Sequence, residues 1–566
     1  MTTYAEFCAA FHTHFTADAN ARVVMGIDVR LGELPDPSLA GLDAAVESAR
    51  GLLAGIGSID TAALTFHESL DLDLARLALE RQIHDATYTF NGRRAICQKP
   101  TAGDDIGDGI FLMFANDPRP DAARLSDITA RLEAVPSYLA ALQSRLDTPV
   151  LRWLSIDREK VEGLPGLLQN IEDWAVRTDF AALERLRAAR AVAESATGDY
   201  LAWLAELPTT THFHLNEQTA RRIVHLRGIG VSLEEIHGYA CRFLADTSET
   251  LSALRDRLVP RYGLPEDTTV EQLHAFLNEK FAVKVVDGNL DSILDRYQAE
   301  REKILDFIKE RDLFPVFEAQ DMKIIRTPGF MEPSIPAGAM MSPPPFRDGI
   351  ATSLVYLTLS EALLDEHTEL GIPGMMIHEG IPGHHLQLAT ASRHPSTIRR
   401  HTDAMEHAEG WTTMLEDYML DVGYMGELTD EARFIGKRDI SRIGARVAID
   451  LFFMTGDRRY LDVGVDCDTS AVDPFEAAGA LLSAVTGFTP GRTQAELNWY
   501  SQERGYPLSY LTGNVLVWSL KRDIEAANPQ MDSVERDRAF HRIYLQSGNM
   551  PVRFLRRIFA HEGMLS

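Results

Sequence analysis

Four residues within one eight-residue stretch have side chains that could bind a metal ion and activate water. They are His378, Glu379, His384 and His385, in the sequence HEGIPGHH. Zinc peptidases commonly carry H-E-x-x-H on a helix, where two histidines one turn apart bind zinc and the glutamate is the general base. In this chain Pro382 stands at the position of the second histidine, so the next histidines come only at i+6 and i+7.

A regular helix would keep these histidines apart. His384 would point about 120° away from His378, and His385 would lie about 10 Å further along the helix axis. Both Zn–N bonds must be only about 2 Å long. Pro382 interrupts helical hydrogen bonding, and the glycines at 380 and 383 permit unusual dihedral angles. We therefore predict a bulge in the helix that brings either His384 or His385 to the second ligand position; the spacing does not choose between them.

The dipeptide His-Glu carries little information by itself. His561-Glu562-Gly563 repeats the first three residues of the motif close to the end of the chain, and no histidine follows it. The information lies in the Pro-Gly-His-His that follows His378-Glu379 in the first copy.

A third ligand is expected from a helix that follows the histidines, as in zinc peptidases with a glutamate ligand. The pattern predicts such a helix over residues 401–423. A glycine inside a helix costs about 1 kcal/mol relative to alanine, so Gly410 suggests that another group approaches closely there. Spacing alone does not choose among the acidic residues of this helix, which are Glu406, Glu409, Glu416 and Asp417.

Helical patterns dominate the rest of the chain and predict a mostly α fold. Apolar residues at helical spacing predict long helices over 121–146, 178–206 and 290–312. The polar, β-branched segment 207–216 is a candidate boundary between lobes. We expect an N-terminal helical lobe over 1–210 and a catalytic helical region over 211–566.

Residues 322–359 are the strongly non-helical part of the sequence. The segments 322–325 and 354–359 are typical of short strands, and the proline-rich stretch between them cannot be helix. We predict a small β-sheet or hairpin next to the site. Its edge strand could hold an extended peptide by main-chain hydrogen bonds, or the hairpin could only brace the site.

The composition narrows the classes of function. A formal net charge of −27 opposes binding to the phosphate backbone of nucleic acids. The four cysteines are widely separated and form no C-x-x-C pair, which argues against a cysteine zinc site or a disulfide scaffold. No signal peptide and no membrane-spanning segment is recognised, so a cytoplasmic protein is expected. No G-x-S-x-G, P-loop or dinucleotide-binding motif is found.

The motif HEGIPGHHLQ is followed by EGW at 409–411, by R-x-x-A-R-x-x-x-D at 442–450 and by L-S-Y-x-x-G at 508–513. Together these segments resemble the bacterial domain-of-unknown-function 885 family, related to gluzincin metallopeptidases of the carboxypeptidase Taq and angiotensin-converting-enzyme group. The resemblance is specific over residues 320–515. It implies a large two-lobed helical fold around a central cleft, with one zinc ion per chain.

The resemblance also implies roles for individual residues. Zinc would be held by His378, His384 and Glu409, with Glu379 as the base, and Tyr510 would stabilise the oxyanion. The helix that carries Arg442, Arg446 and Asp450 would help to frame the site. The sequence departs from the family pattern at 451–453, where Leu-Phe-Phe replaces a Gly-His pair, and at 504–507, where Arg-Gly-Tyr-Pro replaces Pro-Gly-Gln-Ala.

Two hypotheses of function follow. The first is a zinc hydrolase acting on small peptides or amides, like a carboxypeptidase or dipeptidase, in which Glu379 moves the proton and Tyr510 or Tyr506 stabilises the oxyanion. Arg442 or Arg446 could bind a substrate carboxylate, although salt bridges to Asp439 or Asp450 are the more ordinary role of such arginines. The second is a metal-free binding or scaffold protein that keeps the peptidase fold. The sequence gives no oligomeric state.

Overall fold

The computed structural model describes residues 3–327, 338–359, 364 and 367–565. The described chain is mostly α-helical with two small sheets, which confirms the predicted fold class. It divides into two compact units. Unit 1 consists of Met1–Phe213, Pro344–Arg347 and Ser396–His401, and unit 2 consists of His214–Pro343, Asp348–Pro395 and Thr402–Ser566.

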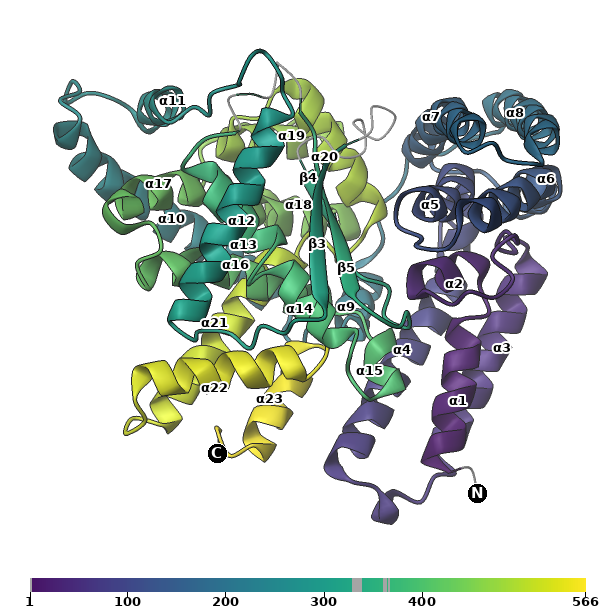
Figure 1. Cartoon of the computed structure of the whole chain (residues 1–566), viewed down its shortest axis with the longest axis horizontal. Coiled ribbons are helices and arrows are strands. Elements are labelled where there is room, and N and C mark those ends of the chain that lie inside the picture. Colours follow the sequence, from purple (N-terminus) through teal and green to yellow (C-terminus); the bar gives the residue numbers. More distant parts are fainter. Residues whose placement is uncertain (1–2, 328–337, 360–363, 365–366, 566) are drawn as a thin grey trace. The chain divides into compact units, whose positions relative to one another are not determined.

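Unit 1 consists mainly of helices (Figure 1). It also contains one two-stranded sheet, β1-β2. Helices α1 and α4 begin with capping boxes, in which Thr3 and Glu6, or Thr65 and Glu68, satisfy the first backbone N–H groups reciprocally. The elements of this unit are α1 (Tyr4–Phe15), α2 (Ala19–Met25), α3 (Leu39–Ile56), η1 (Thr61–Ala63), α4 (Phe66–Thr87), β1 (Thr89–Phe90), β2 (Arg93–Arg94), η2 (Ala95–Gln98), α5 (Ala102–Ala115), α6 (Asp121–Arg145), α7 (Leu151–Arg177), α8 (Leu183–Ala205) and α15 (Thr397–His401).

Helix α15 belongs to unit 1 although it comes late in the chain. Its Arg399 donates from Nε to Oδ1 of Asp71 in α4 over 2.6 Å, and both side chains are almost fully buried. Tyr4 of α1 donates to the other oxygen of Asp71 over 2.8 Å. The predicted boundary at residue 210 would place this helix and Pro344–Arg347 in the C-terminal region. In the structure both segments pack with unit 1.

Unit 2 contains the remaining helices and a three-stranded sheet. Its elements are α9 (Glu217–Leu226), α10 (Leu233–Arg261), α11 (Val270–Lys280), α12 (Ser292–Glu310), β3 (Gln320–Arg326), β4 (Gly338–Met341), β5 (Ala351–Leu357), α13 (Gly371–Glu379), α14 (His384–Ala391), α16 (Met405–Asp421), η4 (Gly426–Leu428), α17 (Thr429–Ile440), α18 (Arg442–Thr455), η5 (Arg458–Leu461), α19 (Pro474–Thr486), α20 (Pro490–Gln502), α21 (Ser509–Ala527), α22 (Ser533–Gln546) and α23 (Val552–His561).

The sheet has the strand order β3-β5-β4. β3 pairs with β5 in parallel, from Gln320 opposite Ala351 to Arg326 opposite Leu357, and β4 pairs with β5 antiparallel. The predicted strands are present, but the alternative of a hairpin between them is wrong because they run in the same direction. The middle strand is buried from Ser353 to Leu357, in keeping with the apolar run from Leu354 to Leu357.

The longest predicted helices are confirmed within a few residues. They correspond to α6, α8, α12 and α16. The proline-rich stretch is non-helical where it is described, and residues 328–337 lie outside the described part. No helix among the described residues combines the length and the apolar composition needed to cross a membrane.

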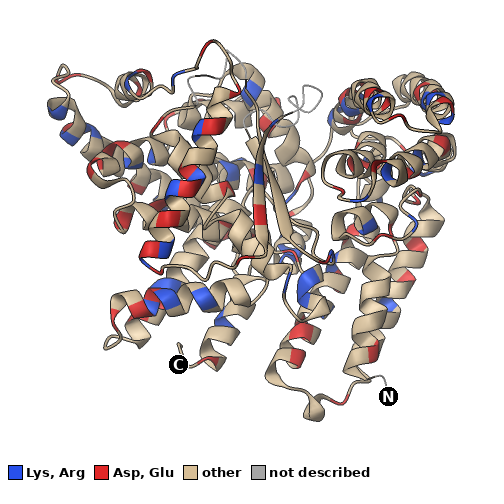
Figure 2. Cartoon of the chain, viewed as in Figure 1, with Lys and Arg blue, Asp and Glu red and all other residues tan. Residues whose placement is uncertain are grey.

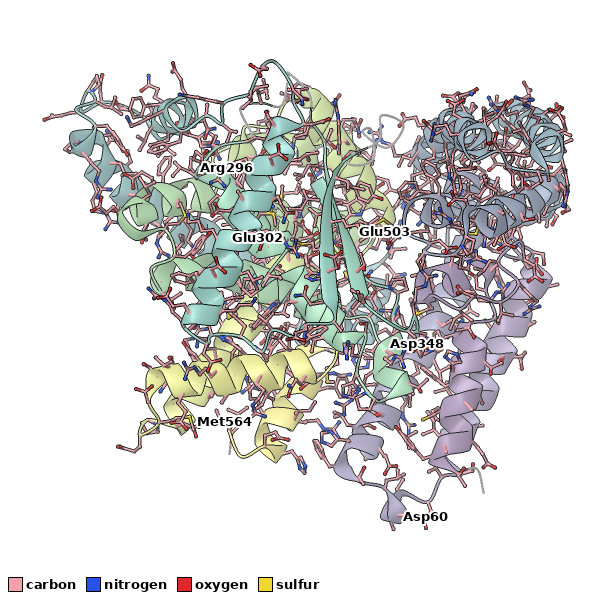
Figure 3. The ribbon with its side chains drawn as sticks, in the orientation of Figure 1. Asp60, Arg296, Glu302, Asp348, Glu503 and Met564 are labelled. Carbon is pink, nitrogen blue, oxygen red and sulfur yellow. The ribbon has the colours of Figure 1, made fainter. Side chains whose placement is uncertain are left out.

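Two buried helices form the centre of unit 2. Helix α18 is buried at every position from Ile443 to Met454, and most residues of α16 are buried as well. Helix α12, by contrast, has a charged outer face, where acidic and basic residues alternate (Figure 2). Its Arg296, labelled in Figure 3, forms ion pairs with Glu300 and Glu369.

Candidate metal centre

The motif HEGIPGHH folds as two helices joined by a four-residue connection. Helix α13 ends at Glu379 and α14 begins at His384, and the Ile381–Pro382 peptide bond between them is cis. The distortion that the sequence predicts is therefore present, but as a complete break in the helix and not as a bulge within it. The break turns the chain so that His378 and His384 face each other, with ring centroids 4.9 Å apart.

Gly383 makes this close return of the chain possible. A Cβ atom on Gly383 would lie 2.0 Å from the carbonyl oxygen of His378 and 2.2 Å from that of Ile377. Any other residue would collide with the last turn of α13, because real Cβ atoms do not approach backbone oxygens so closely. Only glycine therefore fits at this position without a steric clash.

Helix α16 brings the third group, Glu409, and its two following residues fix its place. A Cβ atom on Gly410 would lie 2.5 Å from the carbonyl carbon of Gly513 in α21, which confirms the close approach predicted from that glycine. Trp411 is fully buried and donates from Nε1 to the carbonyl oxygen of Pro382 over 2.9 Å. The three residues EGW therefore hold α16 against both α21 and the α13–α14 connection.

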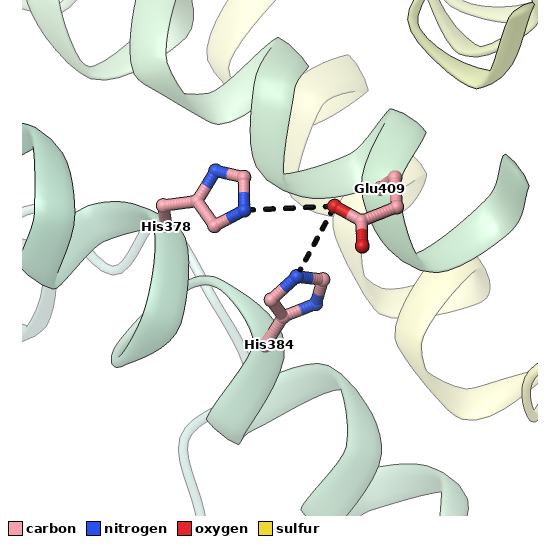
Figure 4. A group of neighbouring side chains, drawn as sticks. All are labelled: His378, His384 and Glu409. Carbon is pink, nitrogen blue, oxygen red and sulfur yellow. Dashed lines mark ion pairs between the residues drawn. The ribbon is translucent and has the colours of Figure 1, made fainter. Parts of the chain in front are cut away.

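The three side chains converge on one point (Figure 4). Oε2 of Glu409 lies 3.6 Å from Nε2 of His378 and 3.4 Å from Nε2 of His384. Ligand atoms about 2.0–2.1 Å from a tetrahedral zinc ion lie about 3.3–3.4 Å from one another, so these two separations are close to those between corners of such a site. All three ligand atoms lie within 4.8 Å of one another. The exposed fractions of the three side chains are 13%, 11% and 5%, which leaves limited access for solvent.

Glu416 orients the first histidine. Glu416 lies two helical turns after Glu409 in α16. Its Oε1 lies 2.7 Å from Nδ1 of His378. A carboxylate at Nδ1 favours the proton on that nitrogen, and Nε2 is then free to act as a ligand. The hydroxyl of Thr412 lies 3.3 Å from the same Nε2. Glu416, which the sequence offered only as a rival ligand, thus contacts the far side of the ring.

His385 points elsewhere, although it is the neighbour of His384. Its Nδ1 lies 2.7 Å from Oγ of Ser353 in β5, and its Nε2 bonds to Oε1 of Gln320 in β3. The ring is fully buried, and this burial, together with the charge of Arg301, lowers the pKa of His385 to about 4. His385 is therefore a neutral side chain that links α14 to the sheet by hydrogen bonds. The structure brings His384, and not His385, to the cluster.

The other acidic residues of α16 lie outside the cluster. Asp417 forms ion pairs with Arg433 and Lys437. Glu406 is buried, and burial raises the pKa of its carboxyl to about 7. Neither joins the group of metal-ligating atoms found within the described chain.

Two phenols stand beside Glu409. Tyr506 donates to Oε1 of Glu409 over 3.4 Å, and its hydroxyl lies 3.4 Å from that of Tyr510 at the start of α21. Burial and the negative charge of Glu409 raise the pKa of both phenols, so both remain protonated donors at neutral pH. The sequence favoured Tyr510 for this place, whereas Tyr506 is the one in direct contact with Glu409.

Asp450 of α18 holds the turn that presents these phenols. Its two carboxylate oxygens accept hydrogen bonds from the backbone N–H groups of Gly505 and Leu508, over 3.0 and 3.1 Å. The side chain is fully buried. The residues on either side of Tyr506 are therefore fixed to the central helix of the unit.

The two arginines of α18 are already paired. Arg446 forms an ion pair with Glu496 over 3.0 Å and donates to the hydroxyl of Tyr500 over 2.9 Å. Arg442 donates to the backbone carbonyl oxygen of Asp439. Neither arginine forms an ion pair with Asp450 in the described part of the chain, and the pairing of Arg446 disfavours a role as a free anchor for a substrate carboxylate. The departure from the family pattern at 451–453 fills the core, since all three side chains are buried.

Electrostatics at the cluster favour a bound positive charge. Burial opposes the charged form of His378, yet the carboxylates of Glu409, Glu416 and Glu379 raise its pKa to about 10. Burial likewise opposes ionisation of Glu409, but His384 and His378 hold the pKa of that carboxyl well below its usual range. A carboxylate with two imidazoles is also the donor set of many catalytic zinc sites, which keep a fourth position open.

One buried atom supports the fit of a cation. Oε2 of Glu409 is buried and has no hydrogen-bond partner in the described part of the molecule, although it is the atom on which the two histidines converge. Buried carboxylate oxygens normally have such partners or bind metals. The residues present therefore fit a zinc ion held by His378, His384 and Glu409.

Glu379 is the acidic side chain that remains available. It is half-buried at the end of α13, next to His378, and makes no hydrogen bond or ion pair with the residues that the structure describes. A carboxylate next to a ligand histidine and without a structural partner can accept a proton from water.

Comparisons with known proteins agree on the fold and leave the chemistry open. The model of a family described as bacterial protein of unknown function (DUF885) matches residues 21–558. A search of curated proteins gives no match. Two solved structures are similar over nearly their whole length. The first, a candidate lipoprotein of unknown function from Shewanella oneidensis, is 18% identical, with 98% of this chain and 99% of that chain covered and a TM-score of 0.76.

The second, a candidate lipoprotein from Colwellia psychrerythraea, is 15% identical, with 99% of each chain covered and a TM-score of 0.78. At these identities the likeness shows the fold alone. The gluzincin relationship, the central cleft and the zinc ion stay predictions.

Proposed function

The chain belongs to the DUF885 family of bacterial proteins of unknown function, and we propose from its site that it is a zinc-dependent hydrolase that cleaves small peptides or related amides. The observation that carries the proposal is the convergence of Nε2 of His378, Nε2 of His384 and Oε2 of Glu409 at ligand spacing. No relative contributes an activity to this proposal.

Zinc held by these three residues would supply a Lewis acid and lower the pKa of a water molecule to about 7. Glu379, adjacent to His378, accepts the proton of the attacking water and passes it to the leaving nitrogen. Tyr510 or Tyr506 donates a hydrogen bond to the oxyanion that develops on the substrate carbonyl. Glu416 keeps His378 in the tautomer that binds through Nε2.

The sheet supports an extended peptide as the substrate. β4 is an edge strand, because it pairs with β5 on one side and stands at the end of the sheet. A Cβ atom on Gly338 of β4 would lie 3.4 Å from Cε of Met375, three residues before His378 in α13. Edge strands bind extended peptides by main-chain hydrogen bonds.

Elemental analysis of purified protein tests the metal first. We expect one zinc per chain in wild type, and its loss in the single variants His378→Ala, His384→Ala and Glu409→Ala. His385→Ala is the matched control, because it removes the neighbouring imidazole, which bonds to the sheet and not to the cluster. His561→Ala controls for the second His-Glu-Gly. A peptide-library digestion with the zinc-loaded protein then tests the reaction.

Wild-type protein that stays free of metal after addition of zinc would refute the hydrolase and leave a metal-free scaffold. Zinc lost in His385→Ala but kept in His384→Ala would refute the ligand assignment.

A further inference from the structure

Three aromatic side chains stand together at the edge of the candidate metal centre. They are Trp499 of α20, Tyr506 and Tyr510, and we call them the aromatic shelf. The ring centroids of Trp499 and Tyr506 are 5.0 Å apart, and those of Tyr506 and Tyr510 are 5.8 Å apart. The shelf touches the cluster through the 3.4 Å contact between Tyr506 and Oε1 of Glu409.

The shelf is only half-buried, unlike the aromatic residues that pack the core beside it. Tyr500, the next residue after Trp499, is fully buried and bonded to Arg446 and Glu496. Trp499, Tyr506 and Tyr510 each keep part of their surface accessible. The indole N–H of Trp499 makes no hydrogen bond with the described part of the chain. Aromatic side chains that keep accessible surface beside a candidate site are available to contact a ligand.

The shelf is also held rigidly from behind. The guanidinium of Arg446 lies 4.6 Å from the ring centroid of Tyr510 and 5.2 Å from that of Trp499. Asp450 fixes the backbone on both sides of Tyr506. Rings held in place by such contacts form a preformed surface. Ligand binding then costs little conformational entropy, because these side chains are already ordered.

The charge of Arg446 is compensated by Glu496, so the shelf presents no free positive charge. Its side chains consist of aromatic carbons with two phenol hydroxyls and one indole N–H. Ligand sites of this kind are lined by apolar and aromatic groups with a few polar groups that fix orientation. We propose that the aromatic shelf is the subsite for an aromatic or large apolar side chain next to the bond that is cleaved.

This inference rests on the proposed peptidase function and names its substrate class. It assigns specificity to Trp499, which lies one ring beyond the metal ligands and which the chemistry itself does not need. Stacking on a rigid aromatic face adds to the gain from area burial, so we expect a preference of about tenfold over a methyl side chain.

Binding is measured by calorimetry in the zinc-loaded Glu379→Gln protein, which holds peptides without cleaving them. The probes are trialanine and the three tripeptides in which one alanine is replaced by phenylalanine. We expect at least one phenylalanine peptide to bind about tenfold more tightly than trialanine. Adding Trp499→Ala should reduce this preference to twofold or less while trialanine binding stays within twofold, and Trp499→Phe should retain most of the preference.

Trp203→Ala is the matched control, because Trp203 is also half-buried and lies in α8 of unit 1. Thermal melting verifies that each variant is folded, and Trp499→Leu replaces Trp499→Ala if the latter does not fold. Cleavage assays of the same peptides with wild-type protein accompany the binding data.

The possible results distinguish a failure of the aromatic subsite from a failure of the proposed peptidase function. Wild-type cleavage of these peptides without a preference for phenylalanine over alanine overturns the subsite and leaves the hydrolase standing. A phenylalanine preference that persists in Trp499→Ala also overturns it. Failure of every peptide to bind and to be cleaved overturns the peptidase proposal and the subsite together.

Discussion

The tripeptide His-Glu-Gly occurs twice in this chain, at 378–380 and at 561–563, and the two copies lie in opposite environments. In the first copy, Glu409 and Glu416 contact the two sides of the His378 ring, and a Cβ atom on Gly380 would lie 2.7 Å from the carbonyl oxygen of Met376. The second copy ends α23 and is exposed, and no atom lies within 4 Å of a Cβ placed on Gly563.

The difference shows where the chemistry originates. The same three residues form a candidate metal centre only where a returning helix supplies a second imidazole and a crossing helix supplies a carboxylate. Local sequence provides the ligand types, and the packing of α13, α14, α16 and α21 provides their convergence. Matched substitutions in the two copies therefore separate the effect of the residue from the effect of its surroundings.

The largest expected difference is in the reaction rate. Glu379→Gln removes the proton acceptor while keeping the shape of the side chain, so we expect a rate loss of about 10²–10⁴-fold in peptide hydrolysis. Zinc content should stay at one per chain, since Glu379 is not among the three converging ligands. Glu562→Gln, the same change in the second copy, should leave the rate unchanged. Equal rates for the two variants would remove Glu379 from the mechanism.

A second expected difference is in stability. Gly383→Ala places a Cβ atom against the carbonyl oxygens of Ile377 and His378, so the α13–α14 connection must shift. We expect a loss of about 3 kcal/mol in the free energy of unfolding, at the upper end for overpacking, with loss of zinc. Gly563→Ala meets open space and suffers only from its φ of +75°, a cost of about 1 kcal/mol. Denaturant unfolding with zinc analysis compares them, and similar losses for both would show that Gly383 is not required by space.

The sequence predicts those parts of the site that depend on neighbouring residues. A distortion after Glu379 follows from Pro382 and the glycines, although a bulge within one helix was predicted and the helix breaks completely. The close approach at Gly410 follows from a glycine within a predicted helix. The choice between His384 and His385 could not be predicted, because it depends on Ser353 and Gln320, which capture His385 from strands distant in the sequence.

The fold was predictable to a similar extent. Long amphipathic helices and the apolar strand β5 follow from periodicity. β4 was missed because four residues, Gly338–Met341, sit in a proline-rich segment and become a strand only by pairing with β5. The parallel pairing of β3 and β5 could not be predicted from the sequence either, because the path of the chain between the two strands sets their relative direction. The assignment of α15 to unit 1 depends on the buried pair of Arg399 and Asp71 in the same way.

A smaller difference is expected between two neighbouring acids of α16. Glu416→Gln removes the carboxylate that orients His378, and outer-shell changes of this kind lower metal affinity by about 10–100-fold. Asp417→Asn is the matched control, because Asp417 pairs with Arg433 and Lys437 away from the cluster and should leave zinc affinity unchanged. Competition titrations with a zinc-binding dye measure both. An unchanged affinity in Glu416→Gln would mean that the 2.7 Å contact does not tune the ligand.

The smallest expected effect is that of chelation on the fold itself. The elements of the cluster are held by contacts that involve no metal: Trp411 on the Pro382 carbonyl, Gly410 against Gly513, and His385 on the sheet. Removal of zinc should therefore abolish hydrolysis while the far-UV circular dichroism changes little. Renewed addition of zinc should restore activity and raise the melting temperature, because a ligand that binds only the folded state stabilises it. Substantial loss of helical signal on chelation would instead mean that zinc is a structural ion. The fold of unit 2 would then depend on the metal, and the cluster would not be a preorganised active site.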